Sequence, residues 1–476
     1  MFLESLKQFM PVVLLLLAIW LVLSRLPKVE LGHTEAFKKR RFWNWLPLGL
    51  TYAFLYMGRY NLTVSKSAFG SLMSNADFGT IFGVGTVVYG FSFVINGPLT
   101  DKIGGRLAIL IAALGAALAN LMMGLVTFYG YTGNLKVTFS VLYALNMFFQ
   151  SFGAVSIVKV NSNWFHVRER GTFGGIFGIL ISLGLYFAYD WGGIIVKSLP
   201  LQWVFFIPTL MLVGFFILSF ILVKDTPVEA GFKELETGDA HIHNGKPINA
   251  IQLAKLMFQN PIILTIALIE FCSGFLRNGI MHWYLIFSKQ TGIAAGFVPK
   301  NWGLLLCCAG ILGGVVAGTI SDKVFQSRRG PVSALLYAVM FTGGILATFM
   351  LHSEYLGWLM VFLSMAIIGV HGMLSGAASM DFGGKRNVGT AVGIIDGMVY
   401  LGTALESLYY GAVLPNGPAA KDPANWHAWP VAMIPVTLIG FFLAVRLWNA
   451  KPTPKAVKKH ELKVPVTLTA EEVTTS

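Results

Sequence analysis

The sequence predicts an all-α membrane protein in which two six-helix halves follow one another along the chain. Of the 476 residues, 55% are hydrophobic and only 12% are charged, whereas an average soluble domain carries about 25% charge. The sequence also divides into apolar runs of roughly 20 residues, the length that crosses about 30 Å of hydrocarbon as a helix. In addition, loop motifs of the first half recur in the second half.

The composition excludes several other classes of protein. Apolar runs of this length favour membrane helices over a β-barrel. The three cysteines, Cys272, Cys307 and Cys308, all lie in apolar runs, so neither a disulfide framework nor a metal site is expected. The net charge of +13 does not indicate nucleic-acid binding, because most of it falls in loops on one side of the membrane.

Twelve apolar spans follow the basic segment KKRR at 38–41. We expect them near residues 43–66, 79–100, 105–128, 137–161, 171–197, 202–223, 260–285, 301–320, 331–351, 356–379, 388–413 and 428–448. With KKRR in the cytoplasm, 17 Lys and Arg residues between positions 38 and 386 fall in internal loops and six fall outside. This asymmetry agrees with the positive-inside rule. The six outer residues are Lys66, Lys136, Lys197, Lys289, Lys300 and Lys421.

A further hydrophobic stretch, residues 11–23, precedes the twelve spans. It has no basic segment before it and no clear small-residue cleavage site, so we expect a retained helix; an interfacial or a cleaved segment is the alternative. The predicted organisation is an extra N-terminal helix at 1–35, an N-terminal six-helix half at 36–223, a cytoplasmic linker at 224–258, a C-terminal six-helix half at 259–450 and a cytoplasmic tail at 451–476.

Two pairs of loop motifs show that the chain repeats itself. GPLTDKIGGR (97–106) follows the second span and GTISDKVFQSRRG (318–330) follows the eighth, with Asp101 and Asp322 221 residues apart. VRERGT (167–172) and GKRNVGT (384–390) place Gly171 and Gly389 218 residues apart. Two parallel six-span halves describe the fold of the major facilitator superfamily, in which substrate binds at the midplane between the halves.

The same offset relates two arginines inside the predicted membrane. Arg59 lies about 16 residues into the first span, and Arg277 lies 218 residues later in the seventh. Each costs roughly 2.5–3.5 kcal/mol on the insertion scale unless it faces a cavity or a partner. Two guanidinium groups at symmetric positions favour a phosphate site, because their N–H donors can bind two oxygens at once. The alternative is structural ion pairing, for which Glu270 is a candidate partner of Arg277.

Further polar side chains are candidates for the same cavity. Tyr52, Tyr56, Arg59 and Thr63 follow i, i+4, i+7, i+11 spacing and line one side of the first span. In the fourth span, Lys159 and Asn163 lie one helical turn apart. Packing tyrosines are the alternative interpretation for Tyr52 and Tyr56. Single polar residues in or near other spans are more typical of packing or gating groups: Asp190, Asp396, Glu406, His282 and His371.

The two aspartate loops have a mechanical interpretation. Asp101 with Lys102 or Arg106 is expected to form a cytoplasmic charge network that breaks and forms again when the halves rock. Asp322 and Arg328 occupy the corresponding loop of the second half.

The motifs together resemble the organophosphate:phosphate antiporter family, which includes glycerol-3-phosphate, hexose-phosphate and glucose-6-phosphate transporters. The likeness covers nearly all of residues 36–448 and includes YMGRYN in the first span, FFQSFGAVSIVKVNSNWFHVRERG in the fourth and FLRNGIMHW in the seventh. The resemblance implies that Arg59 and Arg277 match the family's phosphate-binding arginines and that Tyr52 and Tyr56 match cavity tyrosines.

The chain departs from this family pattern at several positions. Phe93 replaces a second-span lysine of the glycerol-3-phosphate transporter, and Asn163 replaces its fourth-span histidine. Gly274 stands where relatives carry a cavity tyrosine, and the eleventh-span acid–lysine pair of the hexose-phosphate carrier is absent. Assignment of the substrate by analogy is therefore unsafe.

We therefore expect a multi-pass inner (plasma) membrane antiporter that exchanges inorganic phosphate for a sugar phosphate or glycerol phosphate. Arg59 and Arg277 would hold the phosphoryl group, Lys159 would add charge, and Tyr52, Tyr56 and Asn163 would contact the remainder. We expect a monomer in contact with membrane lipid, with no cofactor, metal or nucleic acid. Without spaced metal ligands or a nucleophile–base pair, an enzyme is not expected. The rival functions are a membrane sensor that signals sugar phosphate to a kinase and a proton-coupled symporter of an organic anion, with Asp396 or Glu270 as proton carrier.

Overall fold

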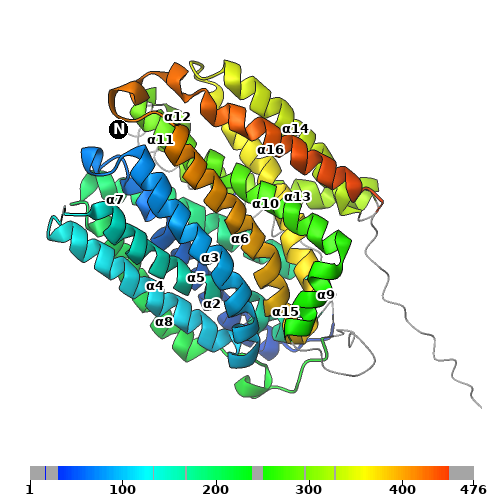
Figure 1. Cartoon of the computed structure of the whole chain (residues 1–476). Helices are drawn as coiled ribbons and strands as arrows, with labels where there is room; N and C mark the ends of the chain where they lie inside the picture. The colour runs from blue at the N-terminus through cyan, green and yellow to red at the C-terminus, as the bar shows by residue number, and fades with distance from the viewer. Residues whose placement is uncertain are drawn as a thin grey trace, which may run out of the picture.

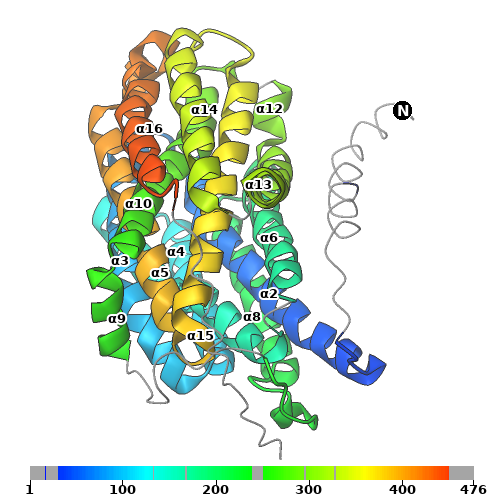
Figure 2. The same ribbon diagram turned by 90° about the vertical axis from the view of Figure 1, so that its right-hand side faces the viewer.

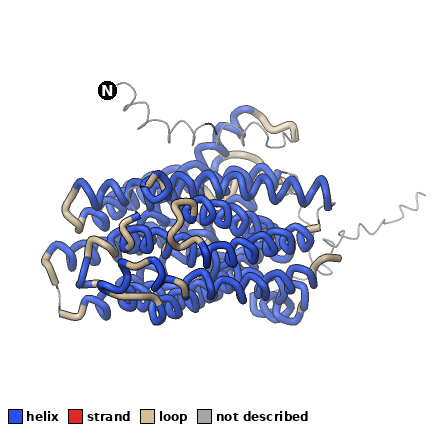
Figure 3. Tube along the Cα trace, turned by 90° about the horizontal axis from the view of Figure 1, so that it is seen from above, coloured by secondary structure: helices blue, strands red, loops and turns tan. Residues whose placement is uncertain are grey.

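A computed structural model describes residue 17 and residues 31–131, 133–166, 169–237, 250–293, 296–325 and 328–449 of the chain. The predicted N-terminal helix, the middle of the linker and the C-terminal tail therefore lie largely outside the described residues, and the domain boundaries remain a prediction. Throughout the described part of the chain the regular elements are helices, and no strand is present (Figure 3).

The N-terminal half begins with α2 (Glu35–Ser65), a helix that the side chain of Thr34 caps by accepting from the amide of Phe37. α3 (Asn75–Ile103) begins with a capping box formed by Ser74 and Asp77. The remaining helices of this half are α4 (Gly105–Phe128), α5 (Leu135–Trp164), α6 (Arg170–Tyr186), α7 (Gly192–Ser198) and α8 (Trp203–Leu222).

One turn of π-helix, η3 (Phe187–Trp191), joins α6 to α7 within a single predicted span. Four short 3-10 turns are present in the described part of the chain: η1 (Gly70–Leu72), η4 (Val228–Ala230), η6 (Gly417–Lys421) and η7 (Pro423–Trp426). The last of them begins the candidate span Pro423–Arg446. π-helical turns are frequent at functional sites, and η3 packs against α13 of the C-terminal half.

The C-terminal half begins with α9 (Ala250–Gln259) at its cytoplasmic entry. The other helices are α10 (Pro261–Met281), α11 (Trp283–Gln290), α12 (Phe297–Lys300), α13 (Trp302–Phe325), α14 (Arg329–Phe349), α15 (Leu356–Val413) and α16 (Ala428–Arg446). In Figure 1 the helices of the first half, coloured from blue through cyan to green, lie beside the helices of the second half, coloured from green to red.

Although α15 carries one label, it contains two membrane spans, Leu356–Ser375 and Val388–Val413. A straight α-helix would separate Ser375 from Asp396 by about 31 Å, yet the two side chains are hydrogen-bonded. The chain therefore reverses between them, and the two spans form an antiparallel hairpin. They are called the tenth and eleventh spans below.

Eleven helical segments in the described part of the chain are long and apolar enough to cross a membrane. The predicted first span, α2, is long enough at 31 residues but is not among them. Its tyrosines, Arg59 and Asn61 lower its hydropathy, so the count of twelve spans remains a prediction. The all-α membrane architecture itself is confirmed.

Glycine-lined contacts hold the two halves together. α3 packs antiparallel on the eleventh span: a Cβ added at Gly79 would collide with Gly411, and one added at Gly97 would collide with the carbonyl of Gly389. α6 lies beside α13 on the other side of the interface (Figure 2). Small residues allow membrane helices to approach backbone to backbone, and this close seam encloses the centre of the molecule.

Candidate functional site

Arg59 lies at the centre of the bundle, where its side chain is fully buried. Its Nε donates to Gln150 (2.9 Å), Nη1 donates to the hydroxyl of Tyr400 (2.9 Å) and Nη2 donates to the hydroxyl of Tyr89 (2.6 Å). The rings of Tyr56 and Tyr89 each lie 4.6 Å from the guanidinium carbon. All of these partners are uncharged, so the charge of Arg59 is oriented but not neutralised.

A polar network behind Arg59 fixes its position in the first half. Gln150 donates to Asn146 (3.0 Å), and Asn146 donates to the backbone carbonyl of Gly58 (3.0 Å). Asn120 donates to the same carbonyl (3.2 Å), and a Cβ at Gly58 would press on that amide. Satisfied buried amides of this kind define one side-chain arrangement, so Arg59 is held rigidly.

Arg277, on α10, is also buried, with 6% of its surface exposed. Its Nε and Nη2 atoms have no hydrogen-bond partner among the described residues. These two nitrogens form the edge of the guanidinium whose N–H bonds run parallel, the geometry that binds two oxygens of one phosphate or carboxylate. Unpaired buried donors are costly, so this edge is a candidate for ligand binding.

Tyr400 brings the two arginines together. Its ring lies 5.7 Å from the guanidinium carbon of Arg59 and 5.9 Å from that of Arg277. The two carbons are therefore no more than 11.6 Å apart. At that distance two unit charges repel by about 1.4 kcal/mol with an effective dielectric constant of 20.

The acid that could have paired with Arg277 has another partner. Glu270 is fully buried and lies 2.8 Å from Nδ1 of His371. Within the described part of the chain, neither Arg59 nor Arg277 forms an ion pair with an acid. Among the described residues, the two guanidinium groups thus lie on either side of Tyr400 without a direct ion pair to an acid.

The tyrosines predicted on the first span lie on the same face as Arg59. Tyr52 and Tyr56 are buried, and their rings meet edge to face with centroids 5.3 Å apart. Tyr56 contacts the guanidinium of Arg59 directly, and Tyr52 packs behind it. Thr63, two turns further toward the outer side, instead lies 2.8 Å from Nδ1 of His282.

Lys159 lies in a different place from the one we expected. Its ammonium is 3.0 Å from the carboxylate of Asp101, at the cytoplasmic end of α3. Asp101 also accepts from the amides of Gly389 (3.2 Å) and Thr390 (2.9 Å) at the start of the eleventh span. In this conformation Lys159 supports a connection between the halves, and its role in substrate binding remains a prediction.

Asn163, predicted to contact substrate from the fourth span, and the loop residue Arg106 also lie on the cytoplasmic side. Asn163 donates to the carbonyl of Asp225 (3.0 Å). Arg106 donates to the carbonyl of Phe220 (2.7 Å), so the partner of Asp101 is Lys159 rather than Arg106 or Lys102. Burial raises the pKa of Asp225, and a hydrogen bond from the Arg106 amide opposes that shift.

In the second half, Arg328 bonds locally, with Nε donating to the carbonyl of Phe325 (3.2 Å). The side chain of Asp322 lies outside the described residues. The predicted symmetry of the two aspartate loops is therefore described for the first half only.

Two departures from the family pattern have a structural explanation. Phe93 stacks on Tyr400, with ring centroids 5.6 Å apart and an interplanar angle of 12°. At Gly274 a side chain would collide with the carbonyl of Val399, because α10 and the eleventh span cross closely there. The aromatic group beside the arginines thus comes from the eleventh span, as Tyr400, and not from α10.

Tyr89, Gln150 and Tyr400 bind Arg59 but were not predicted from the sequence. A signal for Tyr400 exists: Asp396, Tyr400 and Thr403 follow i, i+4, i+7 spacing, which places polar groups on one helical face.

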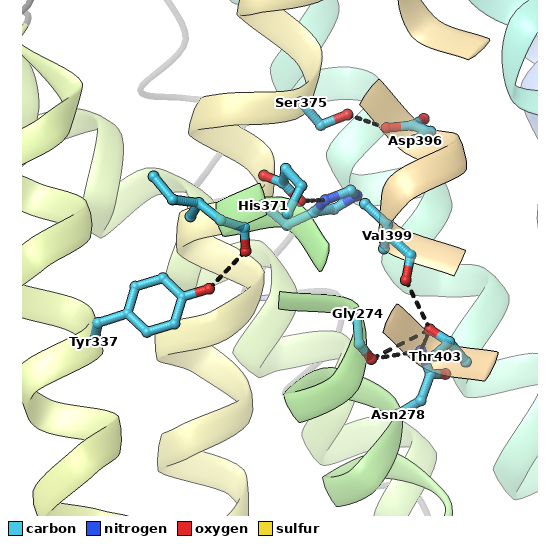
Figure 4. A network of polar contacts seen from close by, with 10 residues as sticks. Gly274, Asn278, Tyr337, His371, Ser375, Asp396, Val399 and Thr403 are labelled. Carbon is cyan, nitrogen blue, oxygen red and sulfur yellow. Dashed lines mark hydrogen bonds and ion pairs between the residues drawn. The ribbon is translucent and has the colours of Figure 1, made fainter. Parts of the chain in front are cut away.

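A second polar network lies in the C-terminal half near Arg277 (Figure 4). His371 contacts Glu270, and Ser375 donates to Asp396. Further along, Asn278 donates to Thr403 (2.7 Å), whose hydroxyl lies 3.2 Å from the carbonyl of Gly274. These bonds join α10 to the tenth and eleventh spans, so Arg277 is held on a braced helix. Glu406, also buried, accepts from Ser407 (2.8 Å).

The helical fold, the repeated halves and the buried cations between them define a membrane transporter. A family model described as Major Facilitator Superfamily matches residues 48–405. The chain therefore belongs to the Major Facilitator Superfamily, and the predicted fold and family are confirmed. The apolar helices and the bacterial transporters among its relatives agree with the predicted multi-pass location in the inner membrane.

Several relatives are similar over nearly the whole chain. The glycerol-3-phosphate transporter of Bacillus subtilis is 25% identical, over 87% of this chain and 94% of its own length. A "probable hexose phosphate transport protein" of Chlamydia trachomatis is 23% identical (90% and 96%). The membrane sensor protein UhpC of Salmonella typhimurium is 24% identical (83% and 88%). These relatives confirm the resemblance to the organophosphate:phosphate antiporter family.

A solved structure supports the fold alone. The crystal structure of a bacterial homologue of the human lysosomal transporter Spinster, in an inward-facing and unoccupied conformation, has a TM-score of 0.63 and 14% identity, covering 88% of this chain and 98% of that chain.

Proposed function

We propose that this protein is a secondary transporter that exchanges inorganic phosphate for a phosphorylated metabolite by alternating access. The observation that carries the proposal is the edge of Arg277 formed by two buried nitrogens that have no hydrogen-bond partner among the described residues, across Tyr400 from the oriented charge of Arg59. Two arginines without a direct ion pair in the described part of the chain favour an anionic ligand. A phosphoryl group has the oxygen spacing that this edge binds best.

The remaining groups around the arginines are suited to the same ligand. Three of the five N–H groups of Arg59 are used by Gln150, Tyr89 and Tyr400, which leaves two for a ligand. The hydroxyl groups of Tyr89 and Tyr400 accept from Arg59 and can donate their own protons to phosphate oxygens. Two arginines and two hydroxyls thus surround one tetrahedral anion.

Contacts between the halves on both sides of this site fit an alternating-access mechanism. On the cytoplasmic side, Asp101 accepts from the backbone and the hydroxyl of Thr390. On the outer side, Asp190 accepts from the amides of Gly303 and Leu304, both 2.8–2.9 Å away. Opening one side requires breaking one set while the other set holds.

The charge of the site gives a reason for obligatory exchange. Without an anion, Arg59 and Arg277 repel each other across the interface that must close during the transport cycle. A bound phosphoryl group changes this repulsion into attraction to a common centre and lowers the energy of the closed state. The empty transporter should therefore change slowly between its inward-open and outward-open states. As a result, net efflux of phosphate should be much slower than exchange.

The proposed class of organic substrate is supported by similar proteins. It is not argued from contacts to the part of the ligand that lies beyond its phosphoryl group. The names of similar proteins refer to glycerol 3-phosphate and hexose phosphate. We propose a sugar phosphate or glycerol phosphate as the organic substrate. The family resemblance does not narrow the choice of organic substrate further, because Phe93 and Gly274 stand where relatives carry polar residues that would have helped to identify it.

Counterflow in proteoliposomes tests this proposal. Vesicles containing the purified protein are loaded with labelled inorganic phosphate, and efflux is recorded after external addition of phosphate, glycerol 3-phosphate, hexose 6-phosphate or the corresponding unphosphorylated compounds. Only the phosphorylated compounds and phosphate should drive efflux. Equal efflux without any external substrate, or no phosphate movement at all, would contradict the proposal.

A sensor is a second candidate, because one similar protein is a membrane sensor. A sensor would bind the phosphorylated compound with the same arginines but would not support counterflow. Equilibrium binding without exchange in the experiment above would therefore favour this function.

A further inference from the structure

A hollow of about 360 Å³ opens between the two halves on the predicted outer side of the membrane. Its walls come from the outer end of α2, the η3–α7 segment, α11, α12 and the start of α13. The hollow lies outside the arginine site, and no residue of that site lines it. Its volume is within the range of about 300–1,000 Å³ found for small-molecule sites.

Positive charge is concentrated in this hollow. Lys197, Lys289 and Lys300 all line it, although the whole outer face has only six predicted Lys and Arg residues. The lysines come from three separate segments. Their proximity is therefore not a consequence of regular spacing along one helix.

One acid, Asp190, also lines the hollow. Both carboxylate oxygens of Asp190 accept backbone amides of α13, from Gly303 and Leu304. These amides are uncharged, so Asp190 keeps its charge, just as Lys289 keeps its charge while donating to the carbonyl of Val64 (3.2 Å). Three lysines and one aspartate leave the lining with an excess of positive charge, and a positively charged cleft raises the local concentration of anionic ligands.

The floor of the hollow adjoins the arginine site. Tyr189 lines the hollow, and its hydroxyl lies 3.0 Å from Nδ1 of His282. The Tyr189 ring stacks on Tyr60, with centroids 5.7 Å apart and an interplanar angle of 18°. Tyr60 in turn lies 5.9 Å from the guanidinium carbon of Arg59. A thin aromatic layer thus separates the three lysines from the arginines.

This layer can open without unfolding a span. Tyr189 lies in the π-helical turn η3, where the backbone hydrogen bonds are already irregular. His282 lies where α10 passes into α11 and contacts Thr63 as well as Tyr189, so it bridges the two halves. When the halves separate on the outer side, these two contacts break and the hollow joins the arginine site.

We propose that the hollow is an outer vestibule that binds the phosphoryl group of an external substrate before it reaches Arg59 and Arg277. Lys197, Lys289 and Lys300 supply the charge, and the Tyr189–His282 contact forms the barrier behind them. This inference rests on the proposed function, because it assumes a phosphorylated substrate. The same chemistry would also suit the phosphate of a lipid headgroup, and the experiment below separates the two sources.

The test compares two pairs of substitutions on the same face of the protein. The hollow variant combines Lys197→Gln with Lys300→Gln and so removes two charges from the hollow. Both side chains are exposed, so the fold should tolerate the change. Lys136→Gln with Lys421→Gln removes two outer charges that do not line the hollow. Phosphate exchange is measured in oriented proteoliposomes with saturating internal phosphate and varied external phosphate.

The vestibule predicts that the hollow variant raises the external KM roughly 3- to 10-fold at low salt, because a charged cleft concentrates its ligand. The maximal rate and the internal KM should stay within twofold of wild type. In about 0.5 M salt the difference should shrink, because screening acts over a few ångströms. An unchanged external KM, or the same change in the control pair, would overturn the proposal.

A binding measurement separates failure of this inference from failure of the proposed function. Labelled inorganic phosphate is bound to detergent-purified wild type, Arg59→Lys, and Arg59→Lys combined with the two hollow substitutions. The vestibule predicts weak binding to Arg59→Lys that the added substitutions abolish, whether or not the protein exchanges phosphate. If wild type exchanges phosphate but this residual binding is absent or unaffected, the vestibule fails alone.

Vesicle composition tests the lipid source. Exchange is measured in vesicles of phosphatidylcholine alone and in vesicles with added phosphatidylglycerol. Phosphatidylglycerol gives the membrane a negative surface potential that repels external phosphate. The vestibule for a soluble substrate therefore predicts that added phosphatidylglycerol raises the external KM of wild type and of the hollow variant by the same factor. A KM that rises with phosphatidylglycerol in wild type but not in the hollow variant would assign the hollow to a lipid headgroup and overturn the proposal.

Discussion

Replacing Arg59 with lysine tests the central geometry, because the substitution keeps the charge and removes the planar fork. Arg59 uses three separate nitrogens to bind Gln150, Tyr400 and Tyr89. A lysine ammonium is a point charge on a flexible stem, so it cannot hold all three groups and also offer two parallel donors to a phosphoryl group. We expect exchange to fall even though the net charge of the site is unchanged.

The size of the loss follows from the hydrogen bonds to the ligand. A hydrogen bond that involves a charged group contributes about 1.5–3 kcal/mol. If lysine replaces a bidentate contact with a single one, the loss of one such bond lowers phosphate exchange roughly 10- to 150-fold, since about 1.4 kcal/mol corresponds to a factor of ten. Arg277→Lys should lose at least as much, because its free edge is the bidentate one.

The assay is phosphate:phosphate exchange in proteoliposomes, with protein content and thermal unfolding recorded for each variant. Arg446→Lys serves as the matched control, because Arg446 is exposed in the last turn of α16. The control should exchange at the wild-type rate. An Arg59→Lys protein that is folded and exchanges within twofold of wild type would refute the bidentate reasoning, and the arginine pair would then be a source of charge only.

Three further predictions concern the surroundings of the site. Tyr400→Phe keeps the ring but removes the hydroxyl that accepts from Arg59, so exchange should fall roughly tenfold with little change in the unfolding temperature; a rate equal to wild type would contradict the role of this hydroxyl. Asp101→Asn removes the charge that binds Lys159 and should slow exchange more than it weakens equilibrium phosphate binding, measured with labelled phosphate; equal losses would argue against a conformational role. Gly274→Ala should lower stability by about 1–3 kcal/mol through overpacking, whereas Gly214→Ala, with open space around it, should not; equal unfolding midpoints for the two would contradict the close helix crossing.

The sequence alone determined the features that depend on one helix or on one property of the chain. Hydrophobic content identifies a membrane protein because the bilayer core selects for apolar side chains. The asymmetric distribution of lysine and arginine orients the spans, and the constant offset between loop motifs reveals the two halves. Arg59 and Arg277 were found in the same way, since a cation at membrane depth stands out against its neighbours.

Only the tertiary structure decided which side chains meet across the interface between the halves. Tyr400 contacts both arginines from 341 and 123 residues along the chain, and Lys159 pairs with Asp101 near the eleventh span. Helix geometry fixes the direction of a side chain within its own helix. It does not fix which helix lies opposite, because that depends on glycine-lined packing between segments that are distant in sequence. The three lysines of the outer hollow are a similar case. Lys197 and Lys300 are exposed and Lys289 is partly buried, and their common location exists only in the folded protein because they come from three separate segments.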